Sequence, residues 1–403
     1  MKCRITNKKT HFIHNFGKMP IANNFLDRED DFNKEFFFNL GVSFSEDVSL
    51  LQLSENPNVK KMFHDNYAFI SGTSTFMDYH FQQTANWLIK NDYLNKNKKN
   101  KIIEIGSNDG IFLKNFNNKI DNIVAYGFEP SKNVYELSKK KGAKGFNSFF
   151  SYETAKSHYK KIKNTDVVYA ANALCHIPNL KDVIDGINLI LKDGGYLIFE
   201  DPYLGSMLAK TSYDQIYDEH IYIFSATAVK KIFERFNFTL VDALPLKTHG
   251  GSMRYVVKKN KDVKISDRLN KILKFEDQSN FEDIRTYKNF SRNCEILKKR
   301  FKSNLIKLKN NNKKIFGYGA TSKSTTILNY CDIGFELIDY ILDTTPTKHW
   351  KYTPGKHIPV LPYDLFKNNF PDIYVLFAWN HEKEIKLKEK KFNRTGKWIT
   401  HLD

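Results

Sequence analysis

The sequence predicts an α/β protein with two doubly wound sheets and a small N-terminal domain that contains β-strands. Apolar, strand-like runs alternate with amphipathic helical runs from residue 101 onwards. A second alternation of the same kind begins near residue 314, after a long lysine-rich helical segment. The first 65 residues are different, being irregular and rich in Asn, Phe and Asp. Strand–helix alternation is typical of a parallel sheet with helices on both faces.

The length and the cysteine content limit the class of protein. A chain of 403 residues is too long for one ordinary core, so several domains are expected. No run of eighteen apolar residues indicates a membrane span, and the start "MKCRITNKKTHFIHNFG" has no apolar signal core. The four cysteines are scattered without close pairs. We therefore expect a reduced, cytoplasmic protein without a disulfide framework or a membrane partner.

The net charge of +18 comes from lysine runs dispersed along the whole chain among many asparagines. A nucleic-acid site concentrates its charge on one element and mixes arginine with aromatic residues. We therefore expect no nucleic-acid partner, and we interpret the charge as favouring an anionic small substrate. The oligomeric state, monomer or dimer, stays open.

We predict three domains, with boundaries at 1–66, 67–258 and 259–403. In the first, "FFFNLGVSFSEDVSLLQL" (36–53) indicates two strands around a turn. The apolar spacing of "FMDYHFQQTANWLIK" predicts a helix within 68–100.

The sequence of the second domain contains residues that are typical of helix starts and helix ends. "IFLKNF" (111–116) is expected to open a helix, and "KDVIDGINLILKDGG" to be a helix that ends at Gly194–Gly195. Ser225 is expected to cap the helix of "SATAVKKIFERF". A closing hairpin is expected around Gly250–Gly251.

The stretch "IIEIGSNDGIFL" (102–113) places a glycine turn after the first strand of this domain. Dinucleotide-binding turns need glycine at three positions, and Asn108 stands at the second of them. The spacing of Gly106 and Gly110 instead favours S-adenosylmethionine, which has no pyrophosphate to hold. Gly106 lets the backbone approach this cofactor.

Three acids near this turn match the charge of that cofactor. Glu104 and Asp109 offer negative charge to the sulfonium and the amino group. Glu129 follows the next strand, about twenty residues beyond the turn, where a carboxylate binds ribose hydroxyls. The alternative is a tight turn with ordinary surface acids.

Two further loops follow later strands and are expected at the same edge of the sheet. "AANALCHIPN" (170–179) brings Asn172 to the cofactor and His176 near the transferable methyl group. "SYDQIYDEHIYIFS" (212–225) is interpreted as a surface connection that holds an acid–base residue.

His220 in the second of these loops has the side chain best suited to proton transfer at neutral pH. Tyr217 is expected to donate to a developing oxyanion, and Glu219 to bind a substrate hydroxyl. Asp218 is expected only to cap or to orient the loop. The alternative is a polar turn whose rings pack in the core.

Two more turns are candidate substrate sites. In "KTHGGSMRY" (247–255), His249, Ser252 and Arg254 flank two glycines, and Arg254 suits a bidentate phosphate contact. The C-terminal "GYGATSKS" departs from a phosphate-binding Walker loop because Ser322 replaces a glycine. We expect Gly319 and Lys323 to hold a diphosphate at a helix amino end. In both cases a purely structural turn is the alternative.

The chain resembles the sugar C-methyltransferases over nearly its whole length. The resemblance lies in seven motifs that occur in the same order: "EIGSNDG", "GFEP", "ANALCHIPN", "YDEHIYIFS", "HGGSMR", "GYGATSKSTTILNY" and "AWNHEKEI". This resemblance implies methylation of C-3 of a nucleotide-linked 4-keto deoxyhexose, with S-adenosylmethionine as cofactor. It implies a class I methyltransferase domain, a Rossmann-like C-terminal domain that assists nucleotide-sugar binding and a zinc-binding N-terminal domain. By motif, the catalytic histidine falls on His220, accompanied by Tyr217, Glu219 and His176.

The sequence departs from this family in two places. Only Cys3 remains of the two C-x-x-C pairs, with Thr6, Ser45 and Val48 at the other three positions, so we expect no metal. In "NYAFISGTS" (66–74), Tyr67 is retained for substrate binding but Phe69 replaces an expected tyrosine. That change bears on which sugar atom is methylated.

The alternatives to sugar C-methylation are that the protein is a sugar O-methyltransferase or a non-catalytic binding or scaffold protein.

Overall fold

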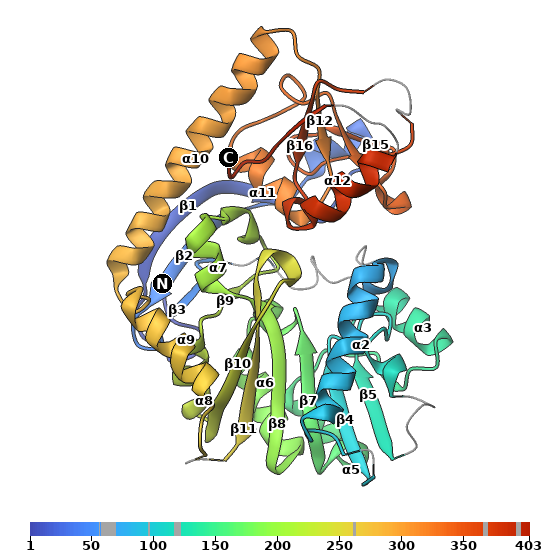
Figure 1. Ribbon diagram of the computed structural model, residues 1–403, viewed down its shortest axis with the longest axis vertical. Coiled ribbons are helices and arrows are strands. Elements are labelled where there is room, and N and C mark those ends of the chain that lie inside the picture. Colours follow the sequence, from blue (N-terminus) through green and yellow to red (C-terminus); the bar gives the residue numbers. More distant parts are fainter. Residues whose placement is uncertain are drawn as a thin grey trace.

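The computed structural model describes residues 1–55, 57, 70–95, 97–116, 122–260, 263–365, 370–391 and 396–403. These residues form three sheets (Figure 1). The largest lies at one end of the molecule and the C-terminal sheet at the other, with the N-terminal sheet beside their junction. The long helix α10 (Ile284–Asn310) runs along the outside from α9, beside the largest sheet, to the end that holds the C-terminal sheet.

The largest sheet has seven strands in the order β10-β11-β8-β7-β4-β5-β6. Only β11 runs antiparallel to its neighbours, which confirms the expected class I methyltransferase sheet and the closing hairpin. The strands are β4 (Asn100–Ile105), β5 (Ile123–Phe128), β6 (Gly145–Phe146), β7 (Thr165–Ala171), β8 (Leu191–Pro202), β10 (Phe238–Leu246) and β11 (Ser252–Lys259).

Side chains alternate across this sheet because successive residues of a strand point to opposite faces. Ile102 and Val167 pack in one core with α2, while Ile103 and Val168 pack in another with α6. Each face is therefore covered by helices, as expected. The helices of this part are α2 (Thr75–Lys90), α3 (Lys132–Lys140), α4 (Tyr152–Ser157), α5 (Tyr159–Ile162), α6 (Leu180–Ile190), α7 (Leu204–Lys210) and α8 (Ala226–Glu234).

Two expected helix boundaries in this part were wrong. α6 ends at Ile190, not at the glycine pair, because Leu191 is extended and pairs with Thr165 at the start of β8. The run 111–116 forms only a 3-10 turn at Leu113–Asn115. The predicted cap of α8 is confirmed, since the Ser225 side chain accepts a hydrogen bond from the Ala228 amide.

The N-terminal sheet is antiparallel, with β1 (His11–Pro20), β2 (Phe37–Ser45) and β3 (Leu50–Leu53), and these last two are the expected pair around a turn. Its fourth strand, β9 (Tyr222–Ile223), comes from the predicted methyltransferase domain and pairs with β3. The histidine loop is therefore joined directly to the N-terminal sheet.

The C-terminal sheet has six strands in the order β14-β15-β13-β12-β16-β17. Adjacent strands of this sheet run parallel, except that β14 runs antiparallel to β15, as expected for the second α/β unit. The elements are β12 (Ile315–Tyr318), α11 (Ser322–Tyr330), β13 (Tyr340–Asp343), β14 (Lys351–Tyr352), β15 (Pro359–Pro362), β16 (Ile373–Leu376), α12 (Glu382–Lys391) and β17 (Lys397–Ile399).

Helix α9 (Asp267–Gln278) lies beyond the predicted boundary at 259 but packs on α8 and β10 of the largest sheet. Its Glu276 is fully buried and accepts hydrogen bonds from the Ala226 and Thr227 amides at the start of α8. An acidic group at a helix N-terminus satisfies amides that the helix itself leaves without partners.

Candidate active site

The glycine turn after β4 lies against the loop after β7. Gly106 has a φ of +72°, and a Cβ built on it would lie 2.9 Å from the Cβ of Ala173. Any side chain here would therefore separate the two loops. The close approach brings the predicted cofactor turn next to the loop that carries His176.

Glu104, at the end of β4, is buried to 2% exposure beneath this turn. Its Oε2 atom has no hydrogen-bond partner among the described residues. Burial raises the pKa of its carboxyl well above the usual value, and the charges of Glu129 and Asp109 add to the rise. A buried carboxyl oxygen without a donor fits a cationic cofactor that brings its own charge and N–H groups.

Glu129, at the end of β5, binds the same turn. Its two carboxylate oxygens accept hydrogen bonds from the amides of Asn108 (2.9 Å) and Ser131 (2.8 Å). Burial raises the pKa of Glu129, and these amides oppose the rise. Each oxygen retains a lone pair, so the carboxylate can still accept from two ribose hydroxyls.

The other predicted cofactor residues of the turn have structural partners. Asp109 is fully buried in an ion pair with Lys141, so its charge is already balanced within the protein. The Asn108 side chain accepts from the Ser71 amide at 2.9 Å. Gly110 has a φ of +74°, and a Cβ there would lie 2.9 Å from Ala143. These residues shape the turn.

The histidine loop, residues 212–225, is buried apart from the half-buried Tyr217, so its interpretation as a surface connection was wrong. The Ile221 amide donates to the Cys175 carbonyl at 2.8 Å and joins this loop to the asparagine loop. The sequence could not show this, because the burial depends on the N-terminal sheet and α11 packing over the loop.

His220 lies at the centre of a short hydrogen-bond chain. Its Nδ1 atom is 2.7 Å from the Gln215 carbonyl oxygen, which can only accept, so Nδ1 carries the proton. Its Nε2 atom therefore accepts a hydrogen bond from the hydroxyl group of Tyr217, at 2.8 Å. Burial lowers the pKa of His220 well below its ordinary value, and the charge of His176 lowers it further. The imidazole is thus neutral at neutral pH.

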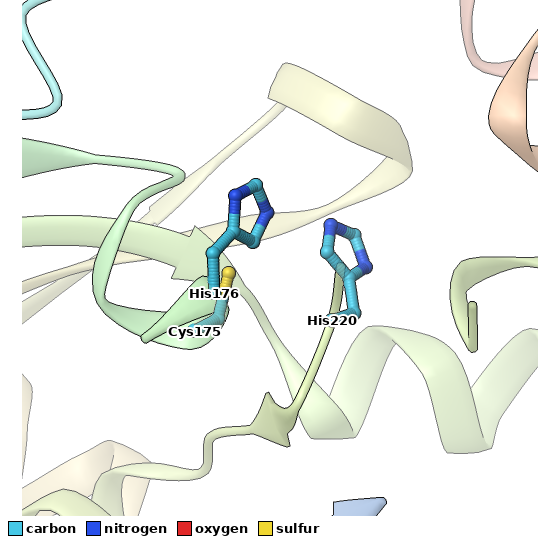
Figure 2. Close-up of side chains that lie close together, drawn as sticks. All are labelled: Cys175, His176 and His220. Carbon is cyan, nitrogen blue, oxygen red and sulfur yellow. The ribbon is translucent and has the colours of Figure 1, made fainter. Parts of the chain in front are cut away.

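His176 from the asparagine loop faces His220, with ring centroids 5.2 Å apart and nearly parallel planes. Figure 2 shows the two rings side by side, with the Cys175 sulfur near them. Burial lowers the pKa of His176 to about 4. The structure therefore brings together the two histidines that the sequence analysis selected from separate loops.

Cys175, His176 and His220 offer ligand atoms within 4.8 Å of one another, which is a possible metal-binding arrangement. However, both ring nitrogens of His220 are hydrogen-bonded. Burial also raises the pKa of the Cys175 thiol well above its usual value, which opposes the thiolate that a metal needs. The arrangement favours proton transfer, and the expected absence of a metal stays a prediction.

The two acids of this loop contact the segment that follows β1. Asp218 accepts from the Ala22 amide at 3.0 Å, and Glu219 accepts from the Asn23 side-chain amide at 2.8 Å. The Asp218 contact therefore joins the loop to this segment. Asn172 lies at the end of β7 with a φ of +49°, and its amide donates to the Glu200 carbonyl at 2.7 Å.

Arg254 is not exposed to a phosphate in this arrangement. Its guanidinium is buried, pairs with Glu200 at 2.7 Å and donates to Thr84 at 2.6 Å. His80 binds the other oxygen of Glu200 at 2.6 Å. Burial alone would raise the pKa of Glu200, but Arg254 and His80 lower it to about 2. The sequence analysis missed Glu200 and His80, although an acid at the end of a rim strand was a signal for the first.

The hairpin tip after β10 meets the C-terminal part. Lys323, near the start of α11, donates to the His249 carbonyl at 3.2 Å and to the Asn380 side chain at 3.3 Å. Its ammonium lies 4.9 Å from the ring centre of Trp379. A Cβ on Gly250 would lie 2.4 Å from the same ring. The predicted groups from the two turns therefore share one junction.

Other members of that set lie nearby. The His249 Nε2 atom is buried without a partner among the described residues, and burial lowers its pKa to about 3. Ser252 is buried and donates to the Thr248 carbonyl at 3.1 Å. Gly319 has a φ of +88° and packs on Ala378, where a Cβ would approach to 2.9 Å.

In the N-terminal domain, the four positions at which the resembled family has its zinc-binding cysteines are occupied by residues that are buried or half-buried. Cys3 and Val48 are buried in the main hydrophobic core, and the oxygens of Thr6 and Ser45 are buried without partners among the described residues. Gln52 holds the first turn by accepting from the Arg4 amide at 3.1 Å. The positions of Tyr67 and Phe69 lie outside the described residues.

In the part of the chain that the structure describes, no helix is both long enough and apolar enough to cross a membrane. The four cysteines are all buried and free.

Known proteins resemble this chain over both of its larger parts. Residues 80–243 match the family model of a methyltransferase domain, and residues 247–402 match that of a C-methyltransferase C-terminal domain. The C-methyltransferase NovU of Streptomyces niveus is 26% identical over 385 residues, which cover 95% of this chain and 90% of the relative.

Solved structures of methyltransferases resemble a portion of this chain. A methyltransferase of Thermotoga maritima that depends on S-adenosylmethionine is 19% identical and covers 45% of this chain and 97% of its own, with a TM-score of 0.33. The magnesium protoporphyrin IX methyltransferase of Synechocystis PCC 6803, solved with S-adenosylhomocysteine, is 13% identical and covers 45% of this chain and 83% of its own, with a TM-score of 0.35.

Proposed function

Since the chain belongs to the C-methyltransferases that depend on S-adenosylmethionine, we propose that it methylates a carbon beside the ketone of a nucleotide-linked keto deoxysugar. The expected atom is C-3 of a 4-keto sugar. The observation that carries the proposal is the chain from Gln215 through His220 to Tyr217 at the cofactor edge of the sheet.

The hydrogen bonds from Gln215 through His220 to Tyr217 position a base and an oxyanion donor side by side. The Gln215 carbonyl holds the proton on Nδ1, so Nε2 is the basic nitrogen. Tyr217 occupies Nε2 with its hydroxyl. When the hydroxyl turns to a substrate carbonyl oxygen, Nε2 is released and can accept a C–H proton. Proton removal beside a ketone requires such stabilisation of the enolate oxygen.

The remaining roles follow from position. S-adenosylmethionine supplies an electrophilic methyl group, and Glu104, Glu129 and the Gly106 turn hold it. His176 lies across from His220, and burial lowers its pKa to about 4, so its imidazole is neutral near pH 7. Glu219 binds a sugar hydroxyl.

The junction between the hairpin tip and α11 supports the binding of a diphosphate. Lys323 is largely buried there, and Lys210 donates to the Gly250 carbonyl at 2.7 Å. Both ammonium groups lie over Trp379, at 4.9 and 5.1 Å from the ring centre. Two cations beside a flat aromatic ring suit a nucleoside diphosphate, whose phosphates are anionic and whose base is planar.

We propose domains of 1–66, 67–258 and 259–403, with the first domain free of zinc and with α9 of the third range packed on α8 and β10 of the second. We further propose that the protein works in the reducing cytoplasm, which suits its four free cysteines, and that it has no nucleic-acid partner. Arg254 does not contact the substrate in this proposal, because its guanidinium already binds Glu200 and Thr84.

The test is a mass-spectrometric screen of keto sugar nucleotides with S-adenosylmethionine, followed by location of the new methyl group. We expect a C-methylated sugar. In the absence of methyl donor, deuterium from the solvent should enter the same carbon, because the base acts before methyl transfer. Methylation of an oxygen without deuterium entry would show the alternative, a sugar O-methyltransferase.

A further inference from the structure

Asn23 lies between three parts of the fold that the sequence analysis treated separately. Its side-chain amide donates to Glu219 of the histidine loop at 2.8 Å. Its side-chain oxygen accepts from Ser322, at the start of α11, at 2.9 Å. The half-buried Asn23 thus uses both ends of its side chain, one toward the histidine loop and one toward the C-terminal part.

The neighbouring residue repeats this connection through the backbone. The Ala22 amide donates to Asp218 at 3.0 Å, and the Ala22 carbonyl accepts from Thr325 of α11 at 2.9 Å. Thr326 of the same helix donates to the Ile216 carbonyl at 3.0 Å. Segment 22–23 is therefore held on both sides by side-chain hydrogen bonds.

The histidine loop needs this support for an electrostatic reason. Asp218 and Glu219 are adjacent in the chain and buried to 1% and 3% exposure. Burial raises the pKa of Asp218 well above its usual value, and the charge of Glu219 raises it further. Buried carboxyl groups are costly unless donors bind them. Segment 22–23 supplies one donor to each acid, and both acids immediately precede His220.

We propose that Asn23 is a positioning residue, which fixes Glu219 and the adjacent base through its bridge to Ser322. The inference rests on the proposed function, because it assigns Asn23 to the same proton-transfer site. It also explains why a serine stands at the Walker-like glycine position: its hydroxyl is the donor to Asn23. The Ser322 contact links the start of α11, the proposed diphosphate site, to the loop that bears the base.

The test compares Asn23→Ala with Asn24→Ala, since the next residue is also asparagine but is exposed. With the keto sugar nucleotide that the wild type methylates, Asn23→Ala should lower kcat by about ten- to a hundredfold, because small misplacements of reacting groups have effects of this size. It should lower deuterium entry equally and leave the KM for S-adenosylmethionine unchanged. Asn24→Ala should behave as the wild type.

A second measurement needs no substrate. Hydrogen–deuterium exchange of peptides that span 212–225 should be faster in Asn23→Ala than in Asn24→Ala, and Ser322→Ala should give a smaller change in the same peptides. Equal exchange and equal kcat in the two asparagine variants would overturn the inference. If no keto sugar nucleotide reacts with the wild type, the proposed function fails, while faster exchange would still show that Asn23 holds the loop.

Discussion

The phenol oxygen of Tyr217 lies 2.8 Å from Nε2 of His220, on the side of the ring opposite the bond from Nδ1 to Gln215. This relationship fixes the tautomer of the imidazole and places the oxyanion donor on the atom that accepts the substrate proton.

Replacing the base should separate binding from chemistry. His220→Asn should bind S-adenosylmethionine as the wild type does, yet lose turnover by about a hundredfold or more, as removal of a general base usually does. Deuterium entry should fall in parallel. His11→Asn is the control, since His11 lies at the surface, with its Nε2 atom 3.4 Å from a carboxylate oxygen of Glu46. Unchanged turnover in His220→Asn would assign the base elsewhere, with His176 the next residue to test.

The pH profile should report the burial of His220. Its pKa is lowered well below the ordinary value of 6.5, so the neutral, basic form persists as the pH falls through the usual histidine range. We expect the acid limb of kcat/KM for the sugar nucleotide to lie below pH 6.5. A limb at or above that pH would contradict a buried, neutral base.

Cofactor binding should release a proton. Burial raises the pKa of Glu104, so the acid holds its proton to higher pH in the free protein, whereas the cationic cofactor favours the carboxylate. The affinity for S-adenosylmethionine should therefore rise as pH increases through the folded-state pKa. Calorimetry in buffers of different ionisation enthalpy measures the proton count. Glu104→Gln should abolish the release, and the exposed Glu153→Gln should not.

Arg254 should act on stability, not on substrate binding. Arg254→Leu leaves the buried Glu200 without its main partner, which costs about 3–5 kcal/mol of unfolding free energy for a broken buried pair. Urea unfolding of the variant and of the exposed Arg292→Leu control measures the difference. A raised KM for the sugar nucleotide with unchanged stability would restore the phosphate role first predicted for Arg254.

Lys323 should act on the nucleotide end of the substrate. Lys323→Ala removes a largely buried cation from the junction and should raise the KM for the sugar nucleotide about tenfold, the effect of roughly 1.4 kcal/mol of lost binding. The kcat and the affinity for S-adenosylmethionine should change little. The exposed Lys383→Ala serves as control. An unchanged KM would make the Lys323 contacts to His249 and Asn380 purely structural.

Much of the fold could be predicted because local patterns determine it. The short apolar run that contains Ile102 and Ile103 predicts a strand buried on both faces, and the side chain of Ser225 caps α8. The helix stop at Gly194–Gly195 was misplaced because pairing of Leu191 with a neighbouring strand outweighs a local glycine signal.

The sequence by itself determined the kinds of groups at the site: a glycine turn with acids, and histidines in two loops after rim strands. Only the tertiary structure decided how these groups are used. In the folded protein, Asp109 forms an ion pair with Lys141 and Arg254 forms one with Glu200. The histidine loop is buried under the N-terminal sheet and α11. The physical reason is that a charge or a hydrogen-bond donor acts on whatever lies within a few ångströms, and chain order does not specify those neighbours.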